Sequence, residues 1–341
     1  MPRDREAPVT GHTSSARKAA STGVEGWTSW QRGGVTTVAV LRRVLDLGLV
    51  PAAAETLRAW WDTTADERAS WDTTIDRALV GGACADRLGF AFASGYAEAL
   101  RALVPAAAGE ITALCATEEA GNHPRAIRTT LVPAGPGRFT LTGKKKWATV
   151  ASEASALLVV ASVGAGDDGT NRLRVVRVAT SASGVTLRSS SAPFVPEIMH
   201  AEVELDNVAI AEADVLPGDG YTDYLKPFRT IEDLHVHGAL LGYLIGVARR
   251  RSMPRDVVET LVALAVATRA LADADTKTEA THVALAGLIG LVTHAVAQVE
   301  EHWSPDGERT RWERDRPLLR VASAARAARR ERAWAVLDGV R

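Results

Sequence analysis

At 341 residues, the chain is long enough for two or three structural units around a sizeable core. Apolar residues make up 46% and charged residues 24%, and the net charge of −1 gives no reason to expect nucleic acid or an anionic membrane as a partner. Cys84 and Cys115 are too few for a disulfide framework or a zinc site. The N-terminus shows no apolar signal segment, and no apolar run reaches the ~18 residues of a membrane span. We therefore expect a cytoplasmic protein.

Residues 1–33 are rich in small and polar side chains, which predicts a flexible N-terminal segment. Residues 34–112 carry apolar side chains at spacings of three and four, which predicts an N-terminal helical domain. Helices are expected at residues 38–49, 57–61, 75–80 and 87–104. The aromatic stripe of the last helix is expected to be core.

The apolar spacing changes to two in residues 113–220, which predicts a middle β domain. Phe139 and Leu141 alternate with polar residues, and a Gly-Pro-Gly turn at 135–137 folds this run back on the preceding one. Residues 157–161 read as a buried strand, and residues 173–178 and 201–205 alternate. Strands without intervening helices favour a central antiparallel β-barrel or sandwich.

Helical spacing returns in residues 221–341, with helices expected at 228–251, 254–272, 278–302 and 317–338. Short connections between four helices predict a C-terminal four-helix bundle. The first of these helices is apolar on nearly all sides and should be buried. The predicted fold class is therefore α+β and multidomain.

The segment 113–152 holds the best candidate for a ligand site. An acidic turn at residues 117–122 and a basic-aromatic stretch at 144–149 should meet at one edge of the sheet. Backbone N–H groups, hydroxyls and a flat indole at that edge suit a planar polar ligand.

The same segment resembles the acyl-CoA dehydrogenase family. TEEAGNH at residues 117–123 is similar to the family turn T-E-x-x-x-G-S-D, and GKKKWAT at 143–149 to G-x-K-x-W-I-T. The turn is one residue short, and Asn122 and His123 stand where the family has Ser-Asp. AEVELDNVAI at 201–210 and DVLPGDG at 214–220 resemble the family stretch that leaves the barrel. The resemblance covers roughly residues 100–246 and indicates a divergent, shortened member.

The resemblance implies FAD between the β domain and the bundle, with an acyl-CoA or other acyl thioester against it. It gives Thr117, Trp147, Thr149 and Cys115 as flavin contacts, and Asn122 and His123 as substrate contacts. Trp147 could instead be a core side chain, and the two threonines could be ordinary strand-edge hydroxyls. The resemblance also implies fatty acid metabolism, a homodimer or homotetramer, and an electron-transfer flavoprotein as a possible partner.

The catalytic base is expected at Glu232. No Glu-Gly-Thr pattern occurs in residues 304–316, where most family members carry the base. EDLHVHGALLG at 232–242 resembles the alternative pattern E-x-L…G…L-G, which puts Glu232 at the base position. An ordinary first-turn helical acid is the alternative reading of Glu232.

The expected reaction is α,β-dehydrogenation of an acyl thioester by a flavin-dependent oxidoreductase. The family stretches R-x-x-F-G and Q-x-x-G-G-x-G, which hold the adenosine end of the cofactor, are missing. A flavin monooxygenase or oxidase of the same fold, and a catalytically degenerate accessory subunit, are therefore the alternatives.

Two further patterns have both a structural and a functional interpretation. Glu232/His235 and Glu279/His282 both have E-x-x-H spacing, which is half of a di-iron site, with Glu259 and Glu331 as further ligands. Core histidines are the favoured reading, and no metal is predicted. The final helix carries six arginines, which form either a phosphate-binding or partner surface or, as favoured here, a solvated face: Arg316, Arg320, Arg326, Arg329, Arg330 and Arg332.

Overall fold

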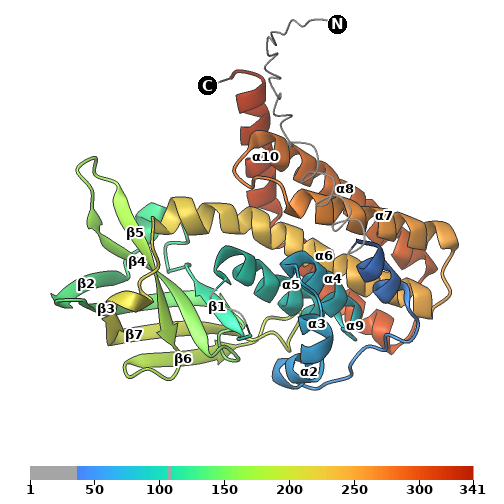
Figure 1. The fold of residues 1–341 in the computed structure, drawn as a ribbon, viewed down its shortest axis with the longest axis horizontal. Coiled ribbons are helices and arrows are strands. Elements are labelled where there is room, and N and C mark those ends of the chain that lie inside the picture. Colours follow the sequence, from blue (N-terminus) through green and yellow to red (C-terminus); the bar gives the residue numbers. More distant parts are fainter. Residues whose placement is uncertain (1–36, 106–108, 341) are drawn as a thin grey trace, which may run out of the picture. The chain divides into compact units, whose positions relative to one another are not determined.

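The computed structural model describes residues 37–105 and 109–340. It separates into two units, residues 1–39 and 40–341, and the description below concerns the second. The predicted flexible segment, residues 1–33, lies outside the described residues. Among the described residues the order is helices, sheet, helices, as predicted (Figure 1).

The N-terminal helices form around buried aromatic side chains. Residues 40–45 are helical, and they are followed by α2 (Leu57–Thr63), α3 (Ala65–Ala69), α4 (Thr74–Ala83) and α5 (Leu88–Leu103). Trp60 of α2 is fully buried and stacks on Phe90 of α5, with ring centroids 5.4 Å apart. The prediction that the aromatic stripe of α5 is core is confirmed at Phe90 and Tyr96, which are buried.

A curled sheet of seven strands follows in the described residues: β1 (Thr112–Cys115), β2 (Thr130–Gly135), β3 (Arg138–Thr149), β4 (Ala156–Ala165), β5 (Asn171–Ala179), β6 (Val185–Ser190) and β7 (His200–Ala211). The strand order is β1-β4-β2-β3-β7-β6, with β5 on β4. The predicted hairpin is confirmed, because Gly135 pairs with Arg138 across the turn.

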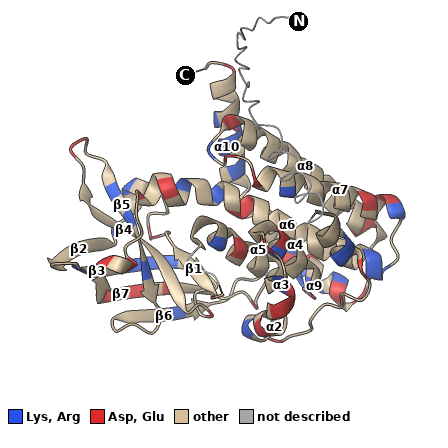
Figure 2. Ribbon diagram, viewed as in Figure 1, with Lys and Arg blue, Asp and Glu red and all other residues tan. Residues whose placement is uncertain are grey.

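Most neighbouring strands are antiparallel, as predicted, but β2 pairs with β4 in parallel at Thr130 and Ser162, and β1 also runs parallel to β4. The β2–β3 hairpin lies between these two strands in the sequence, so periodicity alone could not show their pairing. Figure 2 shows positive segments of β3 near negative segments of β7, and Lys144 forms an ion pair with Glu204 across these strands at 3.0 Å.

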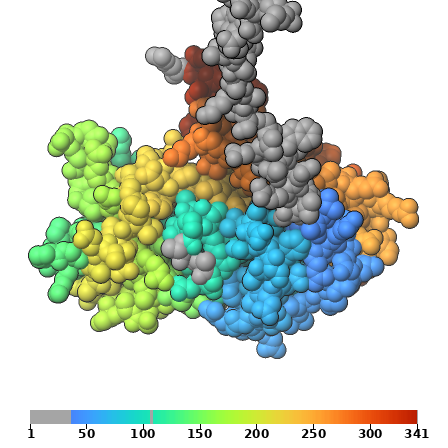
Figure 3. Space-filling model, in the orientation of Figure 1, coloured from blue at the N-terminus to red at the C-terminus, as the bar shows by residue number. Residues whose placement is uncertain are grey.

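The C-terminal helices pack around α6 (Lys226–Arg250), which continues from a π-helical turn, η4 (Gly220–Leu225). The predicted burial of α6 is confirmed, since its side chains from Leu234 to Ala248 are almost all buried. It contacts α4, α5, α7 (Arg255–Ala272) and α8 (Glu279–His302). In Figure 3 the surface of α5 lies beside that of α6.

The predicted last helix, residues 317–338, is wrong at its start. The structure instead has α9 (Gly307–Asp315), a 3₁₀ turn η5 (Arg316–Arg320) and α10 (Ser323–Leu337). The α9 sequence has no apolar period. It is helical because Asp306 caps its N-terminus and because Trp312 stacks on Tyr243 of α6, with centroids 6.1 Å apart.

Helices α4 and α6 meet backbone to backbone. A Cβ atom on Gly242 would lie 1.9 Å from the carbonyl oxygen of Leu79, and one on Gly82 would lie 1.8 Å from that of Ala239. Only glycine allows this approach, which fixes α6 and the residues at its N-terminal end.

Helix α8 is apolar but incompletely covered. By length and composition alone it could cross a membrane, and 33% of its apolar window is buried within the described residues. Core helices of soluble proteins can also be this long and this apolar, so length and composition alone do not indicate a membrane span.

Candidate functional site

Three of the predicted flavin contacts gather at one end of β3. The carbonyl oxygen of Thr117 accepts a hydrogen bond from the N–H of Lys146 at 2.8 Å, which holds the acidic turn against the strand. The Thr149 hydroxyl lies 3.3 Å from Nδ1 of His200, and the Trp147 ring meets the His200 ring edge-on at 6.3 Å. The prediction that these segments meet at one edge is confirmed.

Trp147 projects outward from a bulge in β3. The register shifts between Lys145 and Ala148, and Trp147 has a φ of 57°. This left-handed conformation is costly for an aromatic residue. The indole is 66% exposed, so the alternative that Trp147 is a core side chain is wrong.

Cys115 lies beneath this edge. Its side chain is fully buried, and burial raises the pKa of the thiol to about 12. Its role as a cofactor contact stays a prediction.

Glu118 is a structural anchor that the sequence analysis overlooked. It is 7% exposed, and its carboxylate accepts hydrogen bonds from Lys145 Nζ at 2.6 Å, from the N–H groups of Arg128 and Thr129, and from the Thr129 hydroxyl. Burial favours a higher pKa, but these donors, led by Lys145, outweigh it and lower the pKa of Glu118. This pair ties the acidic turn to β3.

The turn itself carries Asn122 and His123 toward α6. Glu118 and Gly121 exchange two backbone hydrogen bonds of 3.0 and 2.9 Å. Beyond them, Asn122 Oδ1 accepts a hydrogen bond from Arg229 of α6 at 3.2 Å. The turn therefore has the Trp147 edge at one end and α6 at the other.

A cavity of about 780 Å³ lies where this turn, α6, α8 and α10 come together. Glu232, Asn122 and His123 all line it, so the structure brings the predicted base together with the two predicted substrate contacts. Thr117, Trp147 and Thr149 are not among its lining residues. Six cationic side chains also line it, which favours an anionic ligand: Lys226, Arg229, Lys277, Arg326, Arg329 and Arg332.

The neighbouring acids Glu232 and Asp233 have opposite electrostatics. Burial, followed by the charge of Asp233, raises the pKa of Glu232 to about 7, although nearby arginines oppose the shift. Burial favours a raised pKa at Asp233 too, but Arg326, His237 and Arg329 outweigh it, so the pKa of Asp233 is lowered. At neutral pH Asp233 is ionised, while Glu232 can take up or release a proton.

Asp233 fastens α10 to α6. Its Oδ1 accepts a hydrogen bond from Arg326 Nε at 2.7 Å, and its Oδ2 accepts one from Arg329 Nη2 at 2.5 Å. Arg329 also donates to the carbonyl oxygen of Arg229 at 3.1 Å. The favoured prediction of a solvated arginine face is wrong for these two residues. Their spacing of three, which puts both on one helical face, was the available signal.

The two E-x-x-H histidines make hydrogen bonds to other residues of the protein. His235 Nε2 lies 2.9 Å from the Thr74 hydroxyl, its Nδ1 donates to the carbonyl oxygen of Ile231, and burial lowers its pKa to about 4. His282 Nε2 donates to the carbonyl oxygen of Thr276 at 3.0 Å. Within residues 37–105 and 109–340, no group of three His, Cys, Asp or Glu residues could hold a metal ion.

Comparison with known proteins places this architecture. Residues 113–208 match the family described as "Acyl-CoA dehydrogenase, middle domain". The chain is similar to the structure of butyryl-CoA dehydrogenase from Megasphaera elsdenii, with a TM-score of 0.64 and 15% identity over 88% of this chain and 98% of that one. The chain has the acyl-CoA dehydrogenase fold, and its β domain belongs to that family.

Other proteins of the acyl-CoA dehydrogenase fold are about as similar. FMN-bound TdsC from Paenibacillus sp. A11-2 has a TM-score of 0.62 and 14% identity, over 91% of this chain and 96% of that one. FkbI, described as acting in biosynthesis of a methoxymalonyl extender unit, has a TM-score of 0.58 and 16% identity, over 89% and 99%. The comparison with curated proteins finds no match.

A flavin is the cofactor that the acyl-CoA dehydrogenase fold implies, and part of the site fits one. The exposed indole of Trp147, with the partly exposed Thr117 and Thr149 beside it, suits the edge of a planar ring. The cationic cavity at the other end of the turn suits a phosphate. The adenosine end of FAD has no matching motif in the sequence.

Proposed function

We propose that this chain is a flavin-dependent oxidoreductase that dehydrogenates an acyl thioester, such as an acyl-CoA, with Glu232 as the base. The observation that carries the proposal is the position of Glu232. It lines a cavity of ligand size beside Asn122 and His123, and its pKa is raised to about 7.

The raised pKa suits abstraction of the weakly acidic α-proton. A base whose pKa lies near the working pH combines an available unprotonated form with useful proton affinity. Glu232 would take the α-proton on its carboxylate, and a bound flavin would supply the acceptor for the β-hydride. Asp233 is held by Arg326 and Arg329, so it does not compete for the proton.

The cationic residues would position the substrate. Lys226 and Arg229 lie on the first turn of α6, and Arg326 and Arg329 face them from α10 across the cavity. One guanidinium group can donate two parallel hydrogen bonds to the oxygens of one phosphate, which suits the diphosphate of a coenzyme A thioester.

A flavin monooxygenase is the second candidate. The supporting observation is the similarity to TdsC, which is described as a dibenzothiophene monooxygenase and whose structure is reported with FMN and indole. The cavity would then hold a neutral planar ligand in place of an acyl thioester. A degenerate accessory subunit is the third, because the adenosine motifs are missing.

The visible spectrum of the purified protein, with FMN and FAD added in separate titrations, separates the enzymes from the scaffold. Flavin bands near stoichiometry support both enzymes, and a colourless protein that rejects both flavins eliminates them. Anaerobic bleaching of the bound flavin by a panel of acyl-CoA thioesters supports the dehydrogenase. Bleaching that requires NADH or a reductase instead supports the monooxygenase.

Glu232→Gln tests the base. It should keep flavin content and lower the rate of bleaching by about 10²–10⁴-fold, the usual share of general-base catalysis. Glu259→Gln, on the exposed side of α7, is the matched control and should bleach at the wild-type rate. Full activity in Glu232→Gln would remove Glu232 from the mechanism.

The homodimer or homotetramer, the cytoplasmic location, the role in fatty acid metabolism and the electron-transfer flavoprotein as electron acceptor stay predictions. Light scattering of the purified protein measures the first of them. Reoxidation of the bleached protein by an added electron-transfer flavoprotein tests the last.

A further inference from the structure

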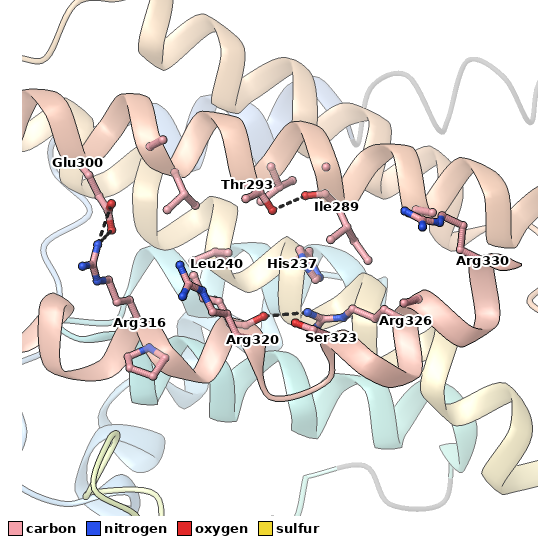
Figure 4. Close-up of a pocket in the computed structure, with 18 of the residues that line it drawn as sticks. His237, Leu240, Ile289, Thr293, Glu300, Arg316, Arg320, Ser323, Arg326 and Arg330 are labelled. Atoms are coloured by element: carbon pink, nitrogen blue, oxygen red, sulfur yellow. Dashed lines mark hydrogen bonds and ion pairs between the residues drawn. The ribbon is translucent and has the colours of Figure 1, made fainter.

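A second cavity, of about 750 Å³, forms a groove between α8 on one side and η5 and α10 on the other. Figure 4 shows Ile289 and Thr293 of α8 facing Arg320 and Arg326, with Leu240 of α6 between the two walls. Its size is within the range of small-molecule sites. None of the residues proposed to carry the dehydrogenation lines it, apart from the two arginines that bind Asp233.

The α8 wall is apolar. The residues that face the groove recur every three or four positions, so they form one helical face: Ala286, Ile289, Thr293, Val296 and Ala297. Leu240 and Leu319 complete the apolar part of the lining. An aliphatic chain laid along α8 would remove this surface from water.

The opposite wall is cationic, and its positive charge is not balanced within the described residues. Asp233 alone serves the guanidinium groups of both Arg326 and Arg329. The side chain of Arg320 forms no hydrogen bond or ion pair with any described residue, although it faces the groove (Figure 4). A groove with this surplus favours an anion.

The two acids of the groove are already paired, so neither neutralises Arg320. Glu300 accepts hydrogen bonds from Arg316 at 3.0 Å and from the Trp312 indole at 2.7 Å. Glu313 accepts one from Arg309 Nε at 2.7 Å. A ligand head group at Arg320 therefore meets free donors rather than repulsion from unpaired carboxylates.

We propose that this groove binds an amphiphilic anion, an aliphatic chain that ends in a carboxylate or a phosphate. The head group binds at Arg320, and the chain lies along the apolar face of α8. The proposal is independent of the dehydrogenation at Glu232 and of any bound flavin.

Isothermal titration calorimetry of the full chain with four probes tests the ligand class. Decanoate and decyl phosphate supply the same chain with two head groups, decanol supplies the chain alone, and inorganic phosphate supplies the charge alone. The amphiphilic anions should bind at least about tenfold more tightly than decanol or phosphate, because only they use both walls. Decanol binding as tightly as both anions would overturn the proposal, as would no binding of either. The better of the two anions identifies the head group.

Two variants locate the binding. Arg320→Ala should weaken binding of the preferred anion by about tenfold, whereas Arg332→Ala, on α10 but outside the groove, should leave it unchanged. Ala297→Trp fills the groove from an exposed position and should abolish binding. Equal effects of the two arginine variants would move the site to the cavity of Glu232 and overturn the proposal.

The groove could also be covered by a second copy of the chain, and light scattering distinguishes this case. A dimer that Ala297→Trp converts to a monomer, with unchanged affinity for decanoate and decyl phosphate, would make the groove a protein interface and overturn the proposal. Glu232→Gln should bind the preferred anion with unchanged affinity. The groove proposal and the dehydrogenation proposal can therefore fail separately.

Discussion

Two neighbouring ion pairs of the acidic turn differ mainly in burial. The side chains of Glu118 and Lys145 are 7% and 0% exposed, whereas those of Glu119 and Lys146, one residue further along each segment, are 84% and 36% exposed. A buried charge that loses its partner keeps the full cost of its desolvation. Burial, and not the presence of a salt bridge, should therefore decide what each pair contributes.

Glu118→Ala should lower the free energy of unfolding by about 3–5 kcal/mol, because Lys145 is left buried and unpaired. Glu119→Ala, the matched control, should change it little, because water replaces the lost partner. Urea denaturation of both variants measures the difference. Equal losses in the two variants would contradict the structural role of Glu118.

A second prediction follows from the raised pKa of Glu232 and concerns the pH dependence of stability. Below the unfolded value of 4.5 the carboxyl is protonated in both states, and as the pH rises toward about 7 the unfolded chain ionises first. Glu232 therefore costs stability above this window. Glu232→Gln should match the wild type near pH 4 and exceed its free energy of unfolding by roughly 1–3 kcal/mol near pH 8.

Denaturation series at several pH values check this prediction. A constant difference between Glu232→Gln and the wild type across the series would show that the pKa of Glu232 is not raised in the folded state. That outcome would also weaken its assignment as the base.

At this scale the sequence predicted residue types better than their partners. The resemblance located Glu232, Asn122 and His123, which the structure brings to one cavity. It could not show that Asp233 holds Arg326 and Arg329, because those residues are some ninety positions apart and only the packing of α10 joins them. It also treated the acidic turn as a ligand site and missed that Glu118 is buried against Lys145.

At the scale of the element, the contact of α4 with α6 controls where α6 and Glu232 lie. Gly242→Ala would place a methyl group against the carbonyl oxygen of Leu79, so the two helices must separate. We expect a loss of about 1–3 kcal/mol or more in the free energy of unfolding. Thermal denaturation measures it.

Gly287→Ala in α8 is the matched control for that experiment. A Cβ atom there meets nothing within 4 Å, so the variant should gain about 0.5–1 kcal/mol from helix propensity. A loss in Gly287→Ala as large as that in Gly242→Ala would show that helix–helix spacing is not the cause.

The elements with a strong apolar period were predicted well, and those held by tertiary contacts were not. Helices α5, α6, α7 and α8 lie within a few residues of their predicted ranges. Helix α9 was missed because Trp312 packs into an aromatic cluster with Tyr243 and Trp303 that no local pattern encodes. The parallel pairing of β1 with β4 was missed for the same reason.

At the scale of the whole molecule, flavin binding should stabilise the folded chain. A ligand that binds only the folded state adds about 2.7 kcal/mol at a hundredfold excess over its Kd. Thermal melting with FMN, FAD and no flavin measures this effect. FMN should raise the melting temperature at least as much as FAD, because the adenosine motifs are missing. A larger shift with FAD would mean that this chain holds the adenosine by other residues.

The wall between the two cavities has a consequence for how their ligands affect each other. Arg326 and Arg329 line both cavities, and both are bound to Asp233, the residue next to Glu232. An anion in the groove that draws Arg326 away leaves more of the Asp233 charge beside Glu232, which makes Glu232 harder to ionise. Linkage is reciprocal, so whatever factor the groove ligand imposes on the affinity of the substrate, the substrate imposes on the affinity of the groove ligand. The chain would then respond to a fatty anion through two arginines, with no movement of its domains.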